Sequence, residues 1–167
     1  MKIALIGMPT SGKSTISKLL HEKLKIPVVD VDKLLEYRFK SSLQEFIDTY
    51  GEKKFLEEED KILIEIEYPE DCIISTGGSV IYAQSAMNYL KTQGVTFYYL
   101  AASLDKLEER LSQQRNMRGI VMNGCTSWHD LLIDRDKLYR HYADYIIETD
   151  TKDLEEIANE IIQNKTQ

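Results

Sequence analysis

The segment Gly7–Ser14 constrains this chain more than any other part of its sequence. It reads GMPTSGKS and matches the phosphate-loop pattern G-x-x-x-x-G-K-[ST] at every fixed position. An apolar run, Lys2–Ile6, precedes it, and an amphipathic stretch, Ser14–Leu24, follows it. In this pattern the glycines let backbone amides approach phosphate oxygens, and the following helix adds the positive end of its dipole. The motif therefore predicts a strand, a loop that binds nucleotide phosphates, and a helix.

Short apolar runs alternate with amphipathic segments along the rest of the chain. Further strands are predicted at Pro27–Asp30, Cys72–Ser75, Val95–Leu100 and Tyr145–Ile147. Helices are predicted from 31 to about Glu67 with an interruption at Gly51, and at Ala83–Thr92, Leu104–Leu111, Trp128–Tyr142 and Asp153–Ile162. Strands separated by helices imply a parallel sheet covered on both faces. Because 167 residues without a linker or repeat are most simply one domain, we expect a single α/β domain over 1–167.

Composition excludes several classes of protein. The net charge of −7 argues against nonspecific nucleic-acid binding, which requires a basic surface. No apolar run approaches the roughly 20 residues that span a bilayer, so no membrane segment is expected. The two cysteines, Cys72 and Cys125, fit a reduced cytosolic compartment. The three histidines, His21, His129 and His141, show no metal-ligand spacing with these cysteines, so no zinc site is expected.

Two acidic residues, Asp30 and Asp32, end the second predicted strand. Open parallel sheets place ligands at the carboxyl ends of their strands. Spaced i, i+2 on an extended chain, the two carboxylates would point the same way, so one could serve Mg²⁺ through water and the other could accept a proton from a substrate hydroxyl. Alternatively, Asp32 only caps the helix that follows.

Adjacent glycines, Gly77 and Gly78, follow the third predicted strand. Such a pair lets backbone amides face a ligand, or else permits a sharp turn that requires a positive φ. Because the pair lies at the carboxyl end of a strand, the ligand-binding role is favoured over the sharp turn.

Arginines could supply the remaining charge. The polar segment 113–126 has no clear period and is predicted to be a mobile loop that contains Arg115 and Arg118. A loop that closes over a nucleotide would use such a residue to neutralise charge on the transferred phosphoryl group. Arg38 and Arg135 lie in predicted helices. Taken singly, each of these arginines is more often a solvated surface charge.

Together these segments resemble the shikimate kinases, which are small members of the nucleoside-monophosphate-kinase-like branch of phosphate-loop proteins. The resemblance covers nearly the whole chain and rests on GMPTSGKST, Val29–Asp32, Gly51–Phe55, Gly77-Gly78, Arg118 and Arg135–Tyr139. It implies a three-layer α/β/α phosphate-loop kinase fold with a five-stranded parallel sheet. It also implies a substrate-binding helical region over 32–66 and a lid over 113–126.

The resemblance implies roles for these residues as well. Lys13, Asp32 and Arg118 would be catalytic, and Ser14 and Asp30 would hold Mg²⁺. The acceptor would be bound by Asp32, Gly77, Gly78 and Arg135. ATP would be bound by Arg118 and by the loop residues Gly7, Pro9, Thr10, Ser11, Gly12, Lys13, Ser14 and Thr15.

Three positions depart from the family pattern. The family has an arginine for the substrate carboxylate where this chain has Leu56, a third glycine where it has Ser79, and an Arg-Pro pair where it has Arg118-Gly119. Losing a charge-assisted contact costs about 1.5–3 kcal/mol, or roughly a ten- to hundred-fold loss of affinity. Lys53, one turn earlier, is a conceivable substitute, although an ammonium group cannot copy the guanidinium fork.

These observations predict an ATP- and Mg²⁺-dependent phosphotransferase that acts on a hydroxyl of a small polar acceptor, with shikimate as the leading candidate. One alternative is a kinase of another polyol or sugar acid, similar to gluconate kinases. Another is a nucleotide-binding regulator that has lost catalysis. We further expect a cytoplasmic monomer in aromatic amino acid biosynthesis, without nucleic-acid or membrane partners.

Overall fold

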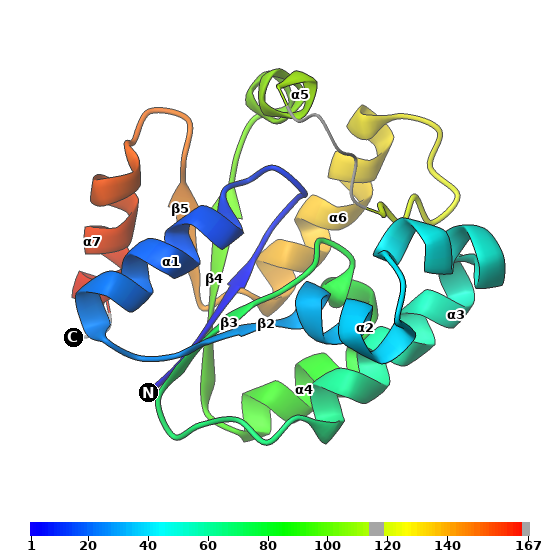
Figure 1. Cartoon of the computed structure of the whole chain (residues 1–167). Helices are drawn as coiled ribbons and strands as arrows, with labels where there is room; N and C mark the ends of the chain where they lie inside the picture. Colours follow the sequence, from blue (N-terminus) through cyan, green and yellow to red (C-terminus); the bar gives the residue numbers. More distant parts are fainter. Residues whose placement is uncertain (114–118, 165–167) are drawn as a thin grey trace.

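The computed structural model describes residues 1–113 and 119–164. Its sheet contains β1 (Lys2–Ile6), β2 (Val28–Asp30), β3 (Cys72–Ser75), β4 (Val95–Ala101) and β5 (Tyr145–Glu148). The helices are α1 (Lys13–Leu24), α2 (Val31–Phe39), α3 (Leu43–Glu65), the 3₁₀ turn η1 (Val80–Tyr82), α4 (Gln84–Thr92), α5 (Leu104–Ser112), α6 (Trp128–Tyr142) and α7 (Leu154–Asn164) (Figure 1). The predicted strands and helices are confirmed, with ends that differ by a few residues, whereas η1 was not predicted.

The five strands form one parallel sheet in the order β2-β3-β1-β4-β5. Ser75 at the end of β3 lies opposite Leu5 of β1 on one side and Asp30 of β2 on the other. The carboxyl ends of these three strands therefore meet at one edge of the sheet. The phosphate-loop motif follows the central strand at this edge, where parallel sheets place their ligands.

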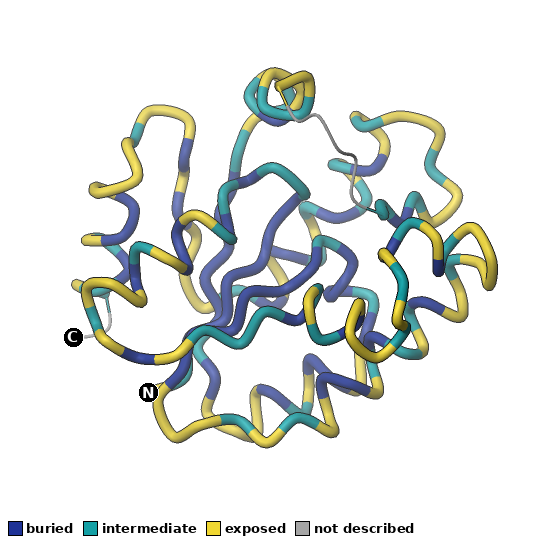
Figure 2. The backbone as a smooth tube through the Cα atoms, viewed as in Figure 1, coloured by how far each residue is buried: buried dark blue, intermediate teal, exposed yellow. Residues whose placement is uncertain are grey.

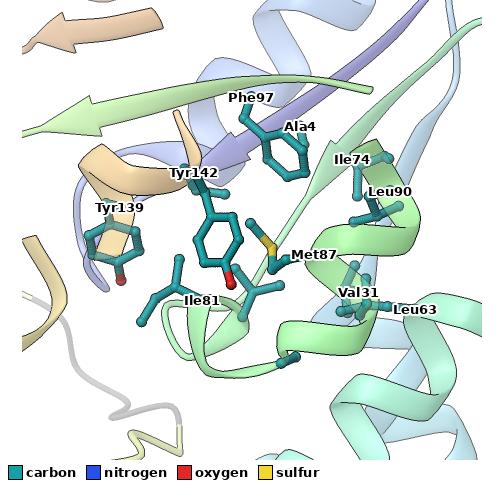
Figure 3. Close-up of a cluster of buried hydrophobic side chains, with 14 of the residues drawn as sticks. Ala4, Val31, Leu63, Ile74, Ile81, Met87, Leu90, Phe97, Tyr139 and Tyr142 are labelled. Carbon is teal, nitrogen blue, oxygen red and sulfur yellow. The ribbon is translucent and has the colours of Figure 1, made fainter. Parts of the chain in front are cut away.

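Helices cover both faces of the sheet, as predicted for a three-layer arrangement. Successive strand residues point to opposite faces. Ile3 and Leu5 of β1 therefore pack under α1 and α7, whereas Ala4 and Ile6 belong to a larger cluster with residues of α2, α3, α4 and α6. Figure 2 shows β1, β3 and β4 as the most continuously buried strands of the sheet. The larger cluster brings residues of strands and helices together (Figure 3), and each fully buried apolar side chain contributes about 1.5–3 kcal/mol.

Most of the helices begin after a short polar residue or a glycine, whereas α4 follows Ala83. Ser42 and Glu45 form a capping box that starts α3. Gly51, with φ 84°, interrupts this helix as predicted. By contrast, α1 follows Gly12 at φ 100° and has no side-chain cap. Its first amides therefore point toward the loop without a protein side chain that satisfies them.

The helices and the cysteines bear on the predictions made from composition. None of the helices in residues 1–113 and 119–164 combines the length and the apolar character that a bilayer-crossing helix needs. Cys72 is buried, Cys125 is half-buried, and both carry free thiols.

Candidate active site

A cavity of about 730 Å³ lies along the carboxyl edge of the sheet. One part of its wall is the phosphate-loop segment from Pro9 to Ile16. Another part consists of residues from α2, the loop after β3 and α6, namely Asp32, Gly77, Gly78, Ser79 and Arg135. A single cavity thus joins the predicted nucleotide-binding residues to the predicted acceptor-binding residues.

The phosphate loop is held in place by its own backbone and by its lysine. Gly7 at φ 148° lies so close to β4 that a Cβ there would be 2.8 Å from the carbonyl oxygen of Leu100, which explains why this position is glycine. The Nζ of Lys13 donates to the carbonyl oxygens of Gly7 and Met8 at 2.7 and 2.8 Å. The buried hydroxyl of Ser11 has no hydrogen-bond partner among the described residues. The loop therefore presents polar groups to the cavity that a bound anion could satisfy.

Asp30 and Asp32 do not lie side by side on an extended segment, as the sequence had suggested. The helix α2 begins at Val31, so Asp32 is in its first turn and faces the main cavity. Asp30 is the cap of this helix, because its carboxylate accepts a hydrogen bond from the amide of Lys33 at 3.2 Å. The expectation of parallel carboxylates was wrong, and the capping role considered for Asp32 belongs to Asp30. Asp30 instead lines a second cavity, which it shares with Ser14.

Gly77 and Gly78 are close-approach glycines rather than turn glycines, since neither has a positive φ. A Cβ on Gly77 would lie 2.9 Å from Oδ1 of Asp32 and 3.0 Å from Oε1 of Glu59. A Cβ on Gly78 would lie 2.7 Å from Nη1 of Arg135. The pair therefore leaves room for two carboxyl groups on one side and a guanidinium group on the other.

Arg135 is buried, with 1% of its surface exposed, and is not a solvated surface charge. Its Nη2 donates to the carbonyl oxygen of Val121, and its guanidinium lies 5.4 Å from the centre of the Tyr82 ring. Its Nε and Nη1 have no hydrogen-bond partner among the described residues. Because an unpaired buried donor is costly, this group is suited to bind an anion in the cavity.

Glu59 is a buried carboxyl group that sequence reasoning missed. Its Oε2 accepts a hydrogen bond from Oγ of Ser79 at 2.7 Å, and its Oε1 has no hydrogen-bond partner among the described residues. Burial raises the pKa of Glu59 to about 7; the Ser79 hydrogen bond opposes this shift and the Asp32 charge adds to it. A signal was present in the sequence, because Glu59 follows Phe55 by four residues and so shares the buried face of the helix.

The segment after the predicted lid arginine is anchored to α3. A Cβ on Gly119 would lie 2.8 Å from the backbone of Leu43 and Gln44, so the position suits glycine. The carboxylate of Glu52 accepts hydrogen bonds from the amides of Met122 and Asn123 at 2.6 and 2.9 Å. Arg115 and Arg118 lie outside the described residues, and their roles stay predictions.

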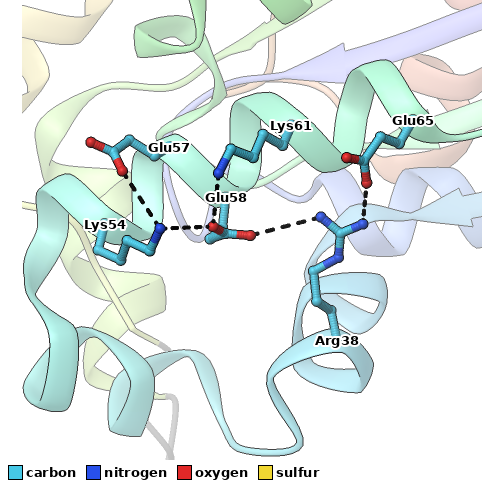
Figure 4. Close-up of polar contacts among 6 residues, drawn as sticks. All are labelled: Arg38, Lys54, Glu57, Glu58, Lys61 and Glu65. Carbon is cyan, nitrogen blue, oxygen red and sulfur yellow. Dashed lines mark hydrogen bonds and ion pairs between the residues drawn. The ribbon is translucent and has the colours of Figure 1, made fainter.

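Two of the cationic residues weighed from the sequence lie outside the cavity. Arg38 of α2 forms ion pairs with Glu58 and Glu65 of α3, in a network that also contains Lys54, Glu57 and Lys61 (Figure 4). Lys53 is exposed and is not part of the cavity wall. Leu56 packs against the larger hydrophobic cluster. Lys53 therefore does not stand in for the family arginine.

On the nucleotide side, sequence reasoning missed Arg110. This residue of α5 lines the cavity, and its Nη1 donates to the carbonyl oxygen of Thr10 at 3.4 Å. The only sequence signal was its i, i+3 spacing from the buried Leu107, whose carbonyl oxygen accepts a hydrogen bond from Oγ1 of Thr10. Lys152 and Asp153, before α7, complete this side of the wall.

Comparison with known proteins gives a consistent picture. A family profile described as shikimate kinase matches residues 9–166. A shikimate kinase from Caldicellulosiruptor saccharolyticus is 35% identical over 162 residues, which are 96% of this chain and 92% of that protein.

Solved structures agree with this match. The shikimate kinase from Acinetobacter baumannii in complex with shikimate superposes with a TM-score of 0.85 at 27% identity, covering 99% of this chain and 92% of that one. A gluconokinase from Sinorhizobium meliloti superposes with a TM-score of 0.58 at 16% identity, covering 99% of this chain and 91% of that one. The second likeness shows a shared fold alone.

Proposed function

Because the chain belongs to the shikimate kinase family, we propose that it transfers the γ-phosphoryl group of ATP to a hydroxyl group of shikimate. One observation carries this proposal: a single cavity holds the phosphate loop together with Asp32 and the buried Arg135. Such a cavity can bring a nucleotide and a small anionic polyol into contact. Bringing two reactants together in the correct orientation is a large part of catalysis of phosphoryl transfer.

In this proposal the acceptor lies between Asp32 and Arg135. Asp32 accepts a hydrogen bond from the hydroxyl to be phosphorylated and orients or deprotonates it. The free Nε and Nη1 of Arg135 donate to the carboxylate of shikimate. Leu56 packs against the core, so Arg135 does this without a second arginine at the family position.

Charge on the transferred phosphoryl group is neutralised from the loop side. Lys13 lies at the start of α1, where backbone amides and a cation can surround phosphate oxygens. Pro9, Thr10, Ser11, Gly12, Ser14 and Thr15 line the same part of the cavity and Gly7 shapes the turn, so these residues would cradle the phosphates. Arg118 would cover the nucleotide from the lid.

The residues present fit Mg²⁺ as an ion shared with the nucleotide. Ser14 and Asp30 line one common cavity and offer the oxygen ligands that this ion prefers. Within residues 1–113 and 119–164, no group of three or more His, Cys, Asp or Glu side chains is placed to hold a metal. Waters and phosphate oxygens would therefore complete the coordination. When bound, Mg²⁺ neutralises charge on the outer phosphates.

The direct test is coupled ADP release with Mg·ATP and shikimate, repeated with EDTA and with gluconate and other polyols. We expect turnover with shikimate that EDTA abolishes. The Asp32→Asn variant should lose most turnover while it binds ATP nearly as well as the wild type. Turnover only with another acceptor, or ATP binding without transfer to any acceptor, would overturn the proposal.

The expected monomeric state and cytoplasmic location belong to the same proposal. Light scattering of the purified protein tests the monomer, and a dimer would contradict it.

A further inference from the structure

Ser79 is the departure from the three-glycine pattern that the proposed function leaves without a role. It follows Gly77 and Gly78 and lines the same cavity as Asp32 and Arg135. A glycine would present only its backbone here, whereas serine adds one hydroxyl group to the wall.

The orientation of this hydroxyl is fixed by the buried carboxyl group of Glu59. Oγ of Ser79 donates to Oε2 of Glu59 at 2.7 Å, and Glu59 is fully buried. A hydroxyl has one proton to donate and two lone pairs that accept. With its proton directed at Glu59, Ser79 can only accept hydrogen bonds from a molecule in the cavity.

This oxygen and Oδ1 of Asp32 both lie near Gly77. The position that a Cβ on Gly77 would take is 2.9 Å from Oδ1 of Asp32 and 3.8 Å from Oγ of Ser79. Both oxygens therefore lie on the same side of Gly77. Neighbouring hydroxyl groups of one small ring could contact both of them. Arg135, in contrast, carries only donors. The cavity thus separates an accepting side for hydroxyl groups from a donating side for a carboxylate.

We propose that Ser79 is a specificity-determining residue whose oxygen accepts a hydrogen bond from a hydroxyl of shikimate that is not phosphorylated. The proposal rests on the proposed function and deepens it. Glu59 acts through Ser79 and is a positioning residue. Leu56, one turn before Glu59, offers that carboxylate no hydrogen bond, and Ser79 supplies one.

The experiment compares shikimate with the two analogues that each lack one of its non-phosphorylated hydroxyl groups. Steady-state kinetics are measured at pH 8, where Glu59 is ionised and Ser79 is the donor. The variants are Ser79→Ala and Ser79→Gly, with Ser41→Ala as the matched control, because Ser41 is half-buried and does not line the cavity. The wild type should prefer shikimate over one analogue in kcat/KM by about ten-fold or more, because a site built to bind a hydroxyl rejects a molecule without it.

Both Ser79 variants should lose about ten-fold in kcat/KM for shikimate, as expected for one hydrogen bond. The kcat/KM of these variants for that analogue should stay within about two-fold of the wild-type value, and their KM for ATP should not change. A Ser79 variant that folds and keeps the wild-type preference would overturn the assignment, as would a wild type that does not discriminate either analogue. If the Ser79→Ala variant does not fold, the same measurements are made on the Ser79→Gly variant. A failure of the proposed function would give a different result, because the wild type itself would then not phosphorylate shikimate.

Discussion

Burying an arginine costs free energy unless its guanidinium group is hydrogen-bonded. Arg135 meets only part of that requirement within the protein, through the carbonyl oxygen of Val121. The aromatic ring of Tyr82 and the close backbone of Gly78 fix where the group points. At this scale, the protein holds a positive charge in a place where a substrate anion can complete its hydrogen bonds.

Arg135→Lys should lower kcat/KM for shikimate about ten- to hundred-fold, because an ammonium group cannot serve the Val121 carbonyl oxygen and a carboxylate with the same fork. The KM for ATP should stay near the wild-type value. The coupled assay measures both quantities. Arg140→Lys is the control, since Arg140 is exposed and pairs with Asp136. An unchanged KM for shikimate in Arg135→Lys would reject the carboxylate contact.

Among the elements, α3 connects most of the acceptor side of the molecule. Its first turn packs against Gly119, Glu52 binds backbone amides within the predicted lid segment 113–126, and Glu59 lies beneath Gly77. The ion pairs with Arg38 fix it to α2 at the surface (Figure 4). Exposed pairs of this kind contribute at most about 1 kcal/mol each. The contacts of Glu52 with backbone amides are therefore the stronger anchor.

Replacing Glu52 by Gln should weaken this anchor, because the amide group can accept from only one of the two backbone donors. Hydrogen bonds to a charged group contribute about 1.5–3 kcal/mol. We expect a comparable loss in the free energy of unfolding and a higher KM for shikimate, because Ile120 and Val121 line the cavity. Urea denaturation and the coupled assay measure the two effects. Glu57→Gln, which removes only an exposed pair with Lys54, should change neither by much; equal effects in both variants would contradict the anchor.

For the molecule as a whole, the buried Glu59 links stability to pH. The groups that interact with it are Ser79, Asp32, Asp60, Arg135 and Tyr139. Burial raises the pKa of Glu59 from 4.5 to about 7. Between these values the folded protein keeps a proton that the unfolded chain releases, so the contribution of Glu59 to stability falls as pH rises through this range.

The Glu59→Gln variant should therefore gain stability relative to the wild type as pH rises. The difference should grow by about 3 kcal/mol between pH 4.5 and 8, because one pKa unit corresponds to about 1.4 kcal/mol. Urea unfolding of both proteins at several pH values measures it. Parallel stability curves would show that Glu59 is ionised in the folded protein already at low pH.

Much of the fold could be predicted from local sequence. The phosphate loop, the strands and the long helices depend on the spacing of apolar residues, on glycines such as Gly12 and Gly51, and on polar caps such as Ser42. The loop residues from Pro9 to Thr15, together with Asp32, Gly77, Gly78 and Arg135, were also predicted as site residues, and the structure brings them to one cavity. Their roles there remain predictions.

The sequence by itself determined the order of strands and helices and placed the phosphate loop between β1 and α1, because these depend on neighbouring residues. Only the tertiary structure decided that Asp30 caps α2 while Asp32 faces the cavity, and that Ser79 bonds Glu59 from another element. It also decided that Glu52 binds a segment 70 residues further along the chain. Such contacts depend on how helices pack on the sheet, and no local spacing encodes the distance between side chains that are far apart in sequence.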